Sequence, residues 1–380
     1  MTILEHFKKG FKENIRQYTM LLALAAIWVI MSSLTDGVFI SPRNISNLFL
    51  QTVTVAIVAL GMTLVIVTGN IDLSVGSVAG FTGAVAAVLQ VKYGWSTPAA
   101  LAAAAGAGLA IGAWHGFWVA YRKVPAFIVT LASMLAFRGA ILGVTGGSTV
   151  SPLHASFKAI GTEYLSPYAS ALLAAAAVVA FVLWSLHNRR QRLEYGFPVA
   201  PARVEGAGIT AQAAVIAAVF AIMVFNQGVP YSVLLLLGLA LVFSFMAEDT
   251  VFGRRLYAIG GNPEAARLSG INIEKNGMYL FMIFGVLTAI AGCVMTARLN
   301  AATTSAGVNM ELDAIAACVI GGTSLMGGEG TIVGALVGAL IMSSLDNGMS
   351  LMNLDITYQY VVKGLILLLA VWVDIANRRK

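Results

Sequence analysis

Long apolar segments alternate with short polar ones along almost the whole chain. About 20 mostly apolar residues are needed for a helix to cross the hydrocarbon core of a bilayer. The segments of this kind are 18–35, 48–68, 73–91, 99–121, 124–144, 168–187, 209–225, 231–247, 278–298, 312–326, 331–352 and 356–374. Because 73–91 and 312–326 are short or begin with polar residues, the pattern predicts an all-α polytopic membrane protein of about 10–12 transmembrane helices.

Glycine-rich stretches interrupt the apolar pattern at two places, TGNIDLSVG at 68–76 and GGTSLMGGEG at 321–330. A broken helix at membrane depth is tolerated only where protein packs around it or where it lines a wet cavity. The sequence also matches itself at an offset of 258, which places Gly69 on Gly327. The predicted topology gives both copies the same direction, as in transporters whose halves are related by an axis along the membrane normal. We therefore predict broken helices and an internal parallel repeat.

The composition supports one membrane domain over residues 1–380. Hydrophobic residues make up 59% of the chain and charged residues 11%, whereas soluble domains are about 45–50% apolar and about 25% charged. The mean hydropathy is +0.85, so the two or three soluble domains that the length alone would suggest are not expected. The basic start resembles a signal peptide, but no A-x-A-like cleavage site follows, and we interpret it as leading into an uncleaved first span.

The basic residues are unevenly distributed between the loops on the two sides. With the N-terminus in the cytoplasm, the cytoplasmic segments are 1–17, 122–123, 188–208, 248–277 and 375–380. They hold 17 of the 23 Lys and Arg residues, and the opposite side receives Arg43, Lys92 and Lys158. Lys and Arg are enriched in cytoplasmic loops, so both termini are predicted to be cytoplasmic. Because the basic residues flank apolar runs and form no face among aromatics, the partner of these charges is membrane lipid and not nucleic acid.

Motifs for catalysis are absent from the sequence. No GxxxxGK[ST] loop occurs, so this chain is not expected to hydrolyse ATP. The four histidines are scattered, and neither HExxH nor another metal pattern is present. Cys293 and Cys318 lie inside apolar stretches and are read as buried small hydrophobes. No catalytic residue, metal site or bound cofactor is therefore predicted, and an intramembrane enzyme is the weakest class.

Polar residues inside or beside the spans are the candidates for a translocation pathway. A charge at the centre of a spanning helix costs roughly 2.5–3.5 kcal/mol on insertion scales. The candidates are Asn70, Asp72, Ser74, His115, Asn347 and Tyr358. For Asp72 a cap on the half-helix after the break is the favoured alternative, and for His115 it is a hydrogen bond between helices. Asn347 and Tyr358 belong to a polar set with Asp346, Asn353, Asp355 and Gln359 that is either a solvated loop or a contact for sugar or partner.

An ion-coupled secondary transporter is the alternative among transport mechanisms. Such a protein is expected to carry a chain of Asp, Glu or His residues across several spans. Here the intramembrane charges are few and are predicted to be unpaired, which disfavours a proton or sodium relay.

The cytoplasmic loop 248–277 contains a short predicted helix, 263–269. Asn262 is a favourable N-cap, Pro263 suits the first helical position and Glu264 the positive end of the helix dipole. Gly270 can adopt the left-handed conformation that ends a helix. Isolated helices this short are marginal, so this one is expected to dock on its own bundle or on a partner. The predicted contact residues are Asn262, Pro263, Glu264, Ala265, Ala266, Arg267, Leu268, Ser269 and Gly270, with Ala265, Ala266 and Leu268 on one side.

The stretch EAARLSG, Glu264–Gly270, resembles the E-A-A-x-x-x-G loop of ABC-importer permeases, although the I-x-L-P portion of that loop is missing. The chain as a whole resembles the ribose/xylose/galactose-type permeases. The segments that carry this likeness are GNIDLSVGSV (69–78), KVPAFIVTLASMLAFRG (123–139), GRRLYAIGGNPEAARLSGI (253–271), ELDAIAACVIGGTSLMGGEGT (311–331) and SLDNGMSLM (344–352). The extra span and basic loop around 184–210 resemble the longer xylose and multiple-monosaccharide permeases.

The resemblance implies a multi-pass permease of the bacterial cytoplasmic (inner) membrane that imports a monosaccharide. It implies a homodimer, a cytoplasmic ABC ATPase subunit that binds ATP and Mg²⁺, and a periplasmic or lipid-anchored sugar-binding protein. It also implies that residues 262–270 couple the permease to the ATPase. D-xylose is the expected substrate, with arabinose, glucose and galactose as alternatives.

Overall fold

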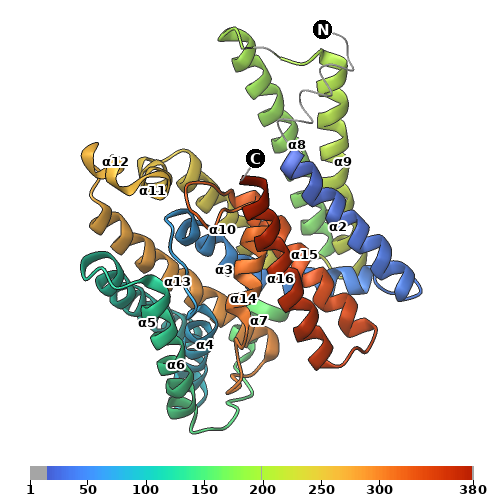
Figure 1. Ribbon diagram of the computed structural model, residues 1–380. Coiled ribbons are helices and arrows are strands. Elements are labelled where there is room, and N and C mark those ends of the chain that lie inside the picture. Colours follow the sequence, from blue (N-terminus) through green and yellow to red (C-terminus); the bar gives the residue numbers. More distant parts are fainter. Residues whose placement is uncertain (1–14, 198, 379–380) are drawn as a thin grey trace.

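The computed structural model describes residues 15–197 and 199–378, and within these ranges the chain is helical with two isolated β-bridges and no strand (Figure 1). The helices in chain order are α2 (Ile15–Leu34), α3 (Pro42–Val67), α4 (Val75–Val91), α5 (Thr97–Gly116), α6 (Ala126–Thr145), α7 (Ala155–Thr162), α8 (Pro167–Glu194), α9 (Ala202–Asn226), α10 (Tyr231–Glu248), α11 (Val251–Gly261), α12 (Pro263–Leu268), α13 (Ile273–Leu299), α14 (Met310–Ile320), α15 (Ile332–Leu351) and α16 (Ile356–Arg378). A π-helical turn, η1 (Phe117–Tyr121), extends α5.

Each predicted apolar segment corresponds to a helix, which confirms the all-α polytopic prediction. Eight of the described helices are long and apolar enough to cross a membrane. Shorter apolar helices occur at 19–34, 75–91 and 356–372, and α14 has 11 residues. Most of the predicted cytoplasmic N-terminal segment, 1–17, lies outside the described residues, as do the last two residues of 375–380.

The centre of the bundle is formed by α3 and α13. Buried side chains make up 83% of the apolar window of α3 and 78% of that of α13, against 6% for α8 and for α9, which extend past the other helices (Figure 1). The two central helices are antiparallel. Gly61, in the second half of α3, faces Phe284 in the first half of α13. Gln51, in the first half of α3, lines the same cavity as Met295 in the second half of α13.

Close helix crossings depend on glycine. A Cβ at Gly108 or Gly112 of α5 would overlap the backbone of Gly285 or Phe281 in α13. Small residues let helix backbones approach each other in membrane proteins, where packing replaces the hydrophobic effect as the driving force. Gly108 and Gly112 of the Ala/Gly-rich α5 therefore serve its contact with the core helix α13.

The packing corrects the predicted parallel repeat. Helix α13 lies against α4 and α5, and α3 lies against α14 and α15, while α4 packs on α6 as α14 packs on α16. This pattern pairs α3–α6 with α13–α16, and because α3 and α13 are antiparallel the two halves run in opposite directions. The matches at an offset of 258 do not reflect a structural repeat. In a chain rich in Ala, Gly and Val, identical residues coincide because of composition alone.

Candidate functional site

The loop 248–277, which is predicted to be cytoplasmic, forms two short helices, α11 and α12, joined at Asn262. The Asn262 side chain accepts hydrogen bonds from the backbone N–H groups of Glu264 and Ala265, both at 3.0 Å. Pro263 takes the first helical position, and Gly270 has a φ of +83°. The predicted helix 263–269 is confirmed as Pro263–Leu268, since its local signals, cap, proline and terminating glycine, agree with one another.

The predicted contact face of α12 is corrected by burial. Ala266 is 4% exposed and lies inside its own chain, while Leu268 is 85% exposed and Ala265 is also exposed. Helix α12 packs on α11 and α13, so Ala266 belongs to the attachment of α12 to the bundle. A partner can reach Ala265 and Leu268, but not Ala266.

Three basic side chains around α12, those of Lys123, Arg254 and Arg267, form hydrogen bonds within the chain. The Glu274 carboxylate accepts from Arg267 at 2.9 Å and from Lys123, which follows η1, at 2.7 Å. Arg254 donates to the Asp249 carbonyl at 3.2 Å. These exposed contacts are each worth under about 1 kcal/mol, but the two on Glu274 connect α12 with α13 and with the loop after η1.

Helix α11 packs on the two interrupted segments at a contact that we call the glycine junction, made by Val67, Gly260, Gly327 and Gly328. Gly328 donates its N–H to the Val67 carbonyl at 2.8 Å. A Cβ on Gly260 would overlap that same carbonyl oxygen and lie 2.7 Å from the Gly328 nitrogen. Gly327 and Gly328 have φ values of +88° and +77°, a region that glycine adopts without steric cost.

Tyr257 adds a hydrogen bond from α11 to the second interrupted segment. Its hydroxyl donates to the Gly330 carbonyl at 2.8 Å. Burial, helped by the nearby Glu248 carboxylate, raises the pKa of Tyr257 above its usual value near 10, so the hydroxyl keeps its proton. Sequence reasoning did not identify Tyr257 or the glycine junction. The signal available was the Gly260-Gly261 pair directly before the Asn262 cap.

Asp72 occupies the first interruption, between α3 and α4, and is 2% exposed. Its carboxylate accepts from the Ser74 N–H at 2.7 Å and the Ser74 hydroxyl at 2.6 Å. The N-cap residue of α4 is Ser74, so Asp72 holds the cap residue and does not itself cap the helix. His115 Nδ1 lies 3.6 Å from the other Asp72 oxygen, and the nearby Asn70 side chain bonds to Thr68. These residues connect α5 to the interruption.

The remaining pathway candidates do not join this group. Asn347 is buried and exchanges hydrogen bonds with the Asn44 side chain at 2.8 and 3.1 Å, whereas Tyr358 is 64% exposed. The polar set predicted around 346–359 is therefore divided between the interior and the surface.

The prediction that the intramembrane charges are unpaired is wrong. Lys363 of α16 lies 3.0 Å from the Asp313 carboxylate and 2.7 Å from that of Asp346. Arg138 of α6 donates to the Ala306 carbonyl at 2.9 Å, and Arg298 of α13 lines a cavity.

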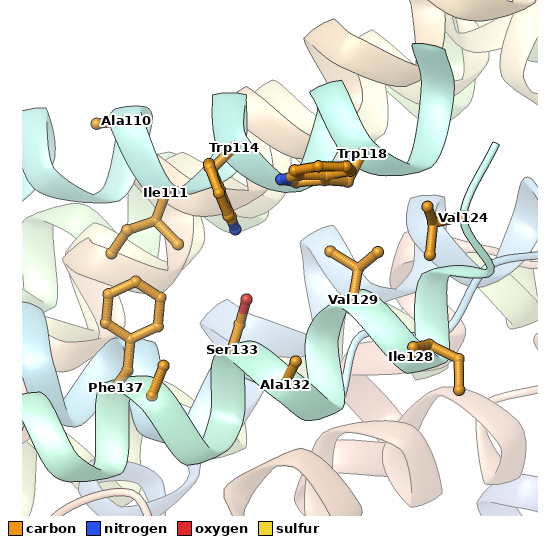
Figure 2. A pocket seen from close by; sticks show the side chains of 11 residues that line it. Ala110, Ile111, Trp114, Trp118, Val124, Ile128, Val129, Ala132, Ser133 and Phe137 are labelled. Atoms are coloured by element: carbon orange, nitrogen blue, oxygen red, sulfur yellow. The ribbon is translucent and has the colours of Figure 1, made fainter. Parts of the chain in front are cut away.

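An apolar cleft of about 680 Å³ lies between α5 and α6. Figure 2 shows Trp114 and Trp118 on one wall and Val129 and Phe137 on the other. Ser133 is the one hydroxyl among the lining side chains. A sugar needs many hydrogen-bond partners, and burying its hydroxyls unpaired is costly, so this cleft does not suit a sugar.

Comparison with known proteins gives full-length matches. The family described as "Branched-chain amino acid transport system / permease component" matches residues 44–371. A xylose transport system permease protein of Haemophilus influenzae is 48% identical over 97% of this chain and 98% of its own length. The corresponding protein of Escherichia coli K12 is 50% identical over 97% and 93%, and a ribose import permease protein of that strain is 39% identical over 93% and 92%. No solved structure matches.

Proposed function

The chain belongs to the family of branched-chain amino acid transport system permease components, and from that premise we propose that it is the membrane-spanning subunit of an ATP-driven D-xylose importer. One observation carries the proposal: the chain is 48–50% identical, over nearly its whole length, to two xylose transport system permeases. The ribose relatives are less similar, at 39%. Nothing in these relatives supports the ion-coupled alternative, and their names describe transport permeases and not enzymes.

The test is uptake of radiolabelled D-xylose into proteoliposomes that contain the permease with the proposed ATPase subunit and sugar-binding protein. We expect uptake that requires ATP and Mg²⁺ and persists when an ionophore collapses the ion gradients. Uptake without ATP that stops with the ionophore would instead establish the ion-coupled alternative.

The coupling element in this proposal is α12 with its caps, Asn262–Gly270, seated on the ATPase subunit. Two features support this role: Leu268 projects from the protein surface, and α11 connects α12 to both interrupted segments at the glycine junction. Motion of the ATPase would then reach the middle of the bundle through backbone contacts. Two permease copies, two ATPase subunits with bound ATP and Mg²⁺, and a periplasmic or lipid-anchored binding protein complete the assembly.

The same proposal places both termini, α11 and α12 in the bacterial cytoplasm, on the basis of the basic-residue distribution. Single cysteines replacing Arg190 and Arg254 should be shielded from an impermeant thiol reagent in intact cells and react after lysis. A cysteine replacing Lys158, which is also exposed, should react in intact cells. Labelling at position 254 without lysis would reverse the orientation and remove α12 from the ATPase.

A further inference from the structure

A polar cavity of about 470 Å³ lies between α3, α13, α14 and α15. This volume is within the range of about 300–1,000 Å³ usual for small-molecule sites. Side chains able to hydrogen-bond a ligand line it from all of these helices and from the loop between α13 and α14. They include Gln51, Arg298, Thr303, Ser305, Asp313 and Asp346.

Arg298 is an unpaired cation in this cavity. Its Nε atom is buried without a hydrogen-bond partner, and among the described residues it forms no ion pair. Thr54, on the same cavity, is 4% exposed and its hydroxyl also has no partner. An unpaired charge inside a membrane protein is costly and marks function by default. A guanidinium offers five N–H donors in a rigid plane, so this wall of the cavity presents donors without acceptors.

Asp346 provides hydrogen-bond acceptors to the same cavity. One of its oxygens bonds to Lys363, while the other is buried and has no hydrogen-bond partner. Lys363 also neutralises part of the charge of Asp313. The Asp313–Lys363–Asp346 cluster has one net negative charge and Arg298 has one positive charge, so the cavity as a whole is close to neutral. A neutral ligand whose groups both donate and accept hydrogen bonds fits this arrangement better than an anion or a cation, and a sugar hydroxyl does both.

The cavity lies at the opposite end of α3 from the glycine junction. Its lining includes Gln51 and Thr54 in the first half of α3, whereas Val67, the last residue of that helix, contacts α11. Gly307 also lines the cavity, and its backbone packs closely against Gly76 at the start of α4. A ligand here would therefore rest on the contact between the two segments that follow α3 and α13.

We propose that this cavity is a monosaccharide-binding site of the permease itself, in which Arg298 donates to sugar hydroxyls and Asp346 accepts from them. The inference rests on the proposed function and specifies where the chain holds its sugar. Binding here is weak, because a transported solute must leave the site as readily as it enters.

Another polar cavity, of about 730 Å³, is lined by Arg43, Asn44, Asn47 and Tyr164 near the start of α3. Its arginine is exposed and can be hydrated by bulk water, whereas Arg298 is partly buried and unpaired. Arg43 therefore provides a matched control for Arg298.

The direct test follows the protection of a cysteine by sugar. Ser305 lines the proposed site and is exposed, so Ser305→Cys should react with an impermeant thiol reagent in the reconstituted importer. We expect D-xylose at millimolar concentration to slow this reaction about tenfold, while sorbitol at the same concentration has no effect. Thr303→Cys serves as the second reporter if Ser305→Cys lowers folded yield. An unchanged labelling rate at saturating D-xylose, in a complex that imports xylose, would refute the site.

The second arm compares Arg298→Gln with Arg43→Gln. Arg298→Gln should abolish the protection and lower D-xylose uptake about tenfold, with ATPase association and the sugar affinity of the binding protein unchanged. Arg43→Gln should leave protection and uptake near wild type, and the reverse result would move the site to the other cavity. If the importer transports a different monosaccharide, that sugar should protect instead of xylose. The substrate in the proposed function would then be wrong while the site stands.

Discussion

Replacing Gly260 by alanine is expected to lower ATP-driven sugar uptake about tenfold or more. The added Cβ would overlap the Val67 carbonyl oxygen. Both atoms belong to backbone, so no side chain can move aside to relieve the contact. Overpacking costs roughly 1–3 kcal/mol, and about 1.4 kcal/mol corresponds to a factor of ten in an equilibrium. The substitution should displace α11, and with it α12, from the ends of both interrupted segments.

Gly261 provides a matched control one residue away in the same helix. A Cβ at Gly261 meets nothing within 4 Å, and its φ is not positive. Gly261→Ala should therefore keep uptake near the wild-type rate and stabilise α11 slightly through the better helix propensity of alanine.

The measurements for this pair are uptake, complex assembly and ATP hydrolysis with and without loaded binding protein. We expect Gly260→Ala to insert and to purify with the ATPase, but to lose the stimulation of hydrolysis by loaded binding protein. Wild-type stimulation in Gly260→Ala would mean that the glycine junction does not transmit motion. Equal losses in Gly260→Ala and Gly261→Ala would point to a general defect of α11.

The features that the sequence predicted are local ones. The spans follow from runs of apolar residues, and α12 follows from a cap at Asn262, a proline after it and a glycine at 270. Each of these signals lies within the element that it predicts or a few residues from it. The broken segment at 68–76 was also predictable, because Gly69 and Asn70 interrupt an otherwise continuous apolar pattern.

The features that the sequence did not reveal depend on packing between distant segments. The glycine junction joins Val67, Gly260 and Gly328, and each of these glycines read alone is an ordinary turn or packing residue. The direction of the internal repeat depends on whether α3 and α13 are antiparallel, which self-matching in an Ala/Gly/Val-rich chain cannot report. The pairing of Lys363 with Asp313 and Asp346 likewise brings together three helices.

The face of α12 shows the same limit on a small scale. Residues three and four apart share a side of a helix, so spacing places Ala265 with Leu268 correctly. Spacing does not say which side meets the bundle. The burial of Ala266 shows that its side of α12 meets the bundle. A substitution at Leu268, and not at Ala266, therefore tests the contact with a partner.

Leu268→Asp is expected to weaken association with the ATPase subunit about tenfold or more. Leu268 is 85% exposed in the permease alone, and in the proposed assembly this large apolar side chain would anchor α12 in a pocket on the ATPase. Loss of a central interface anchor costs about 2 kcal/mol or more, and a carboxylate adds the cost of desolvating an unpaired charge. Because the side chain makes little contact with its own chain, the permease should insert and melt as the wild type does.

Two further variants separate docking from folding. Leu193→Asp places the same charge on a 53%-exposed leucine at the end of α8, on the same predicted side of the membrane, and should leave ATPase association unchanged. Ala266→Asp buries a charge inside the chain and should lower the yield and melting temperature of the permease itself. Co-purification with the ATPase and thermal melts in detergent read out both effects. If Leu268→Asp retains the ATPase as well as Leu193→Asp does, α12 does not dock through Leu268, and the coupling contact must lie elsewhere on the loops predicted to be cytoplasmic.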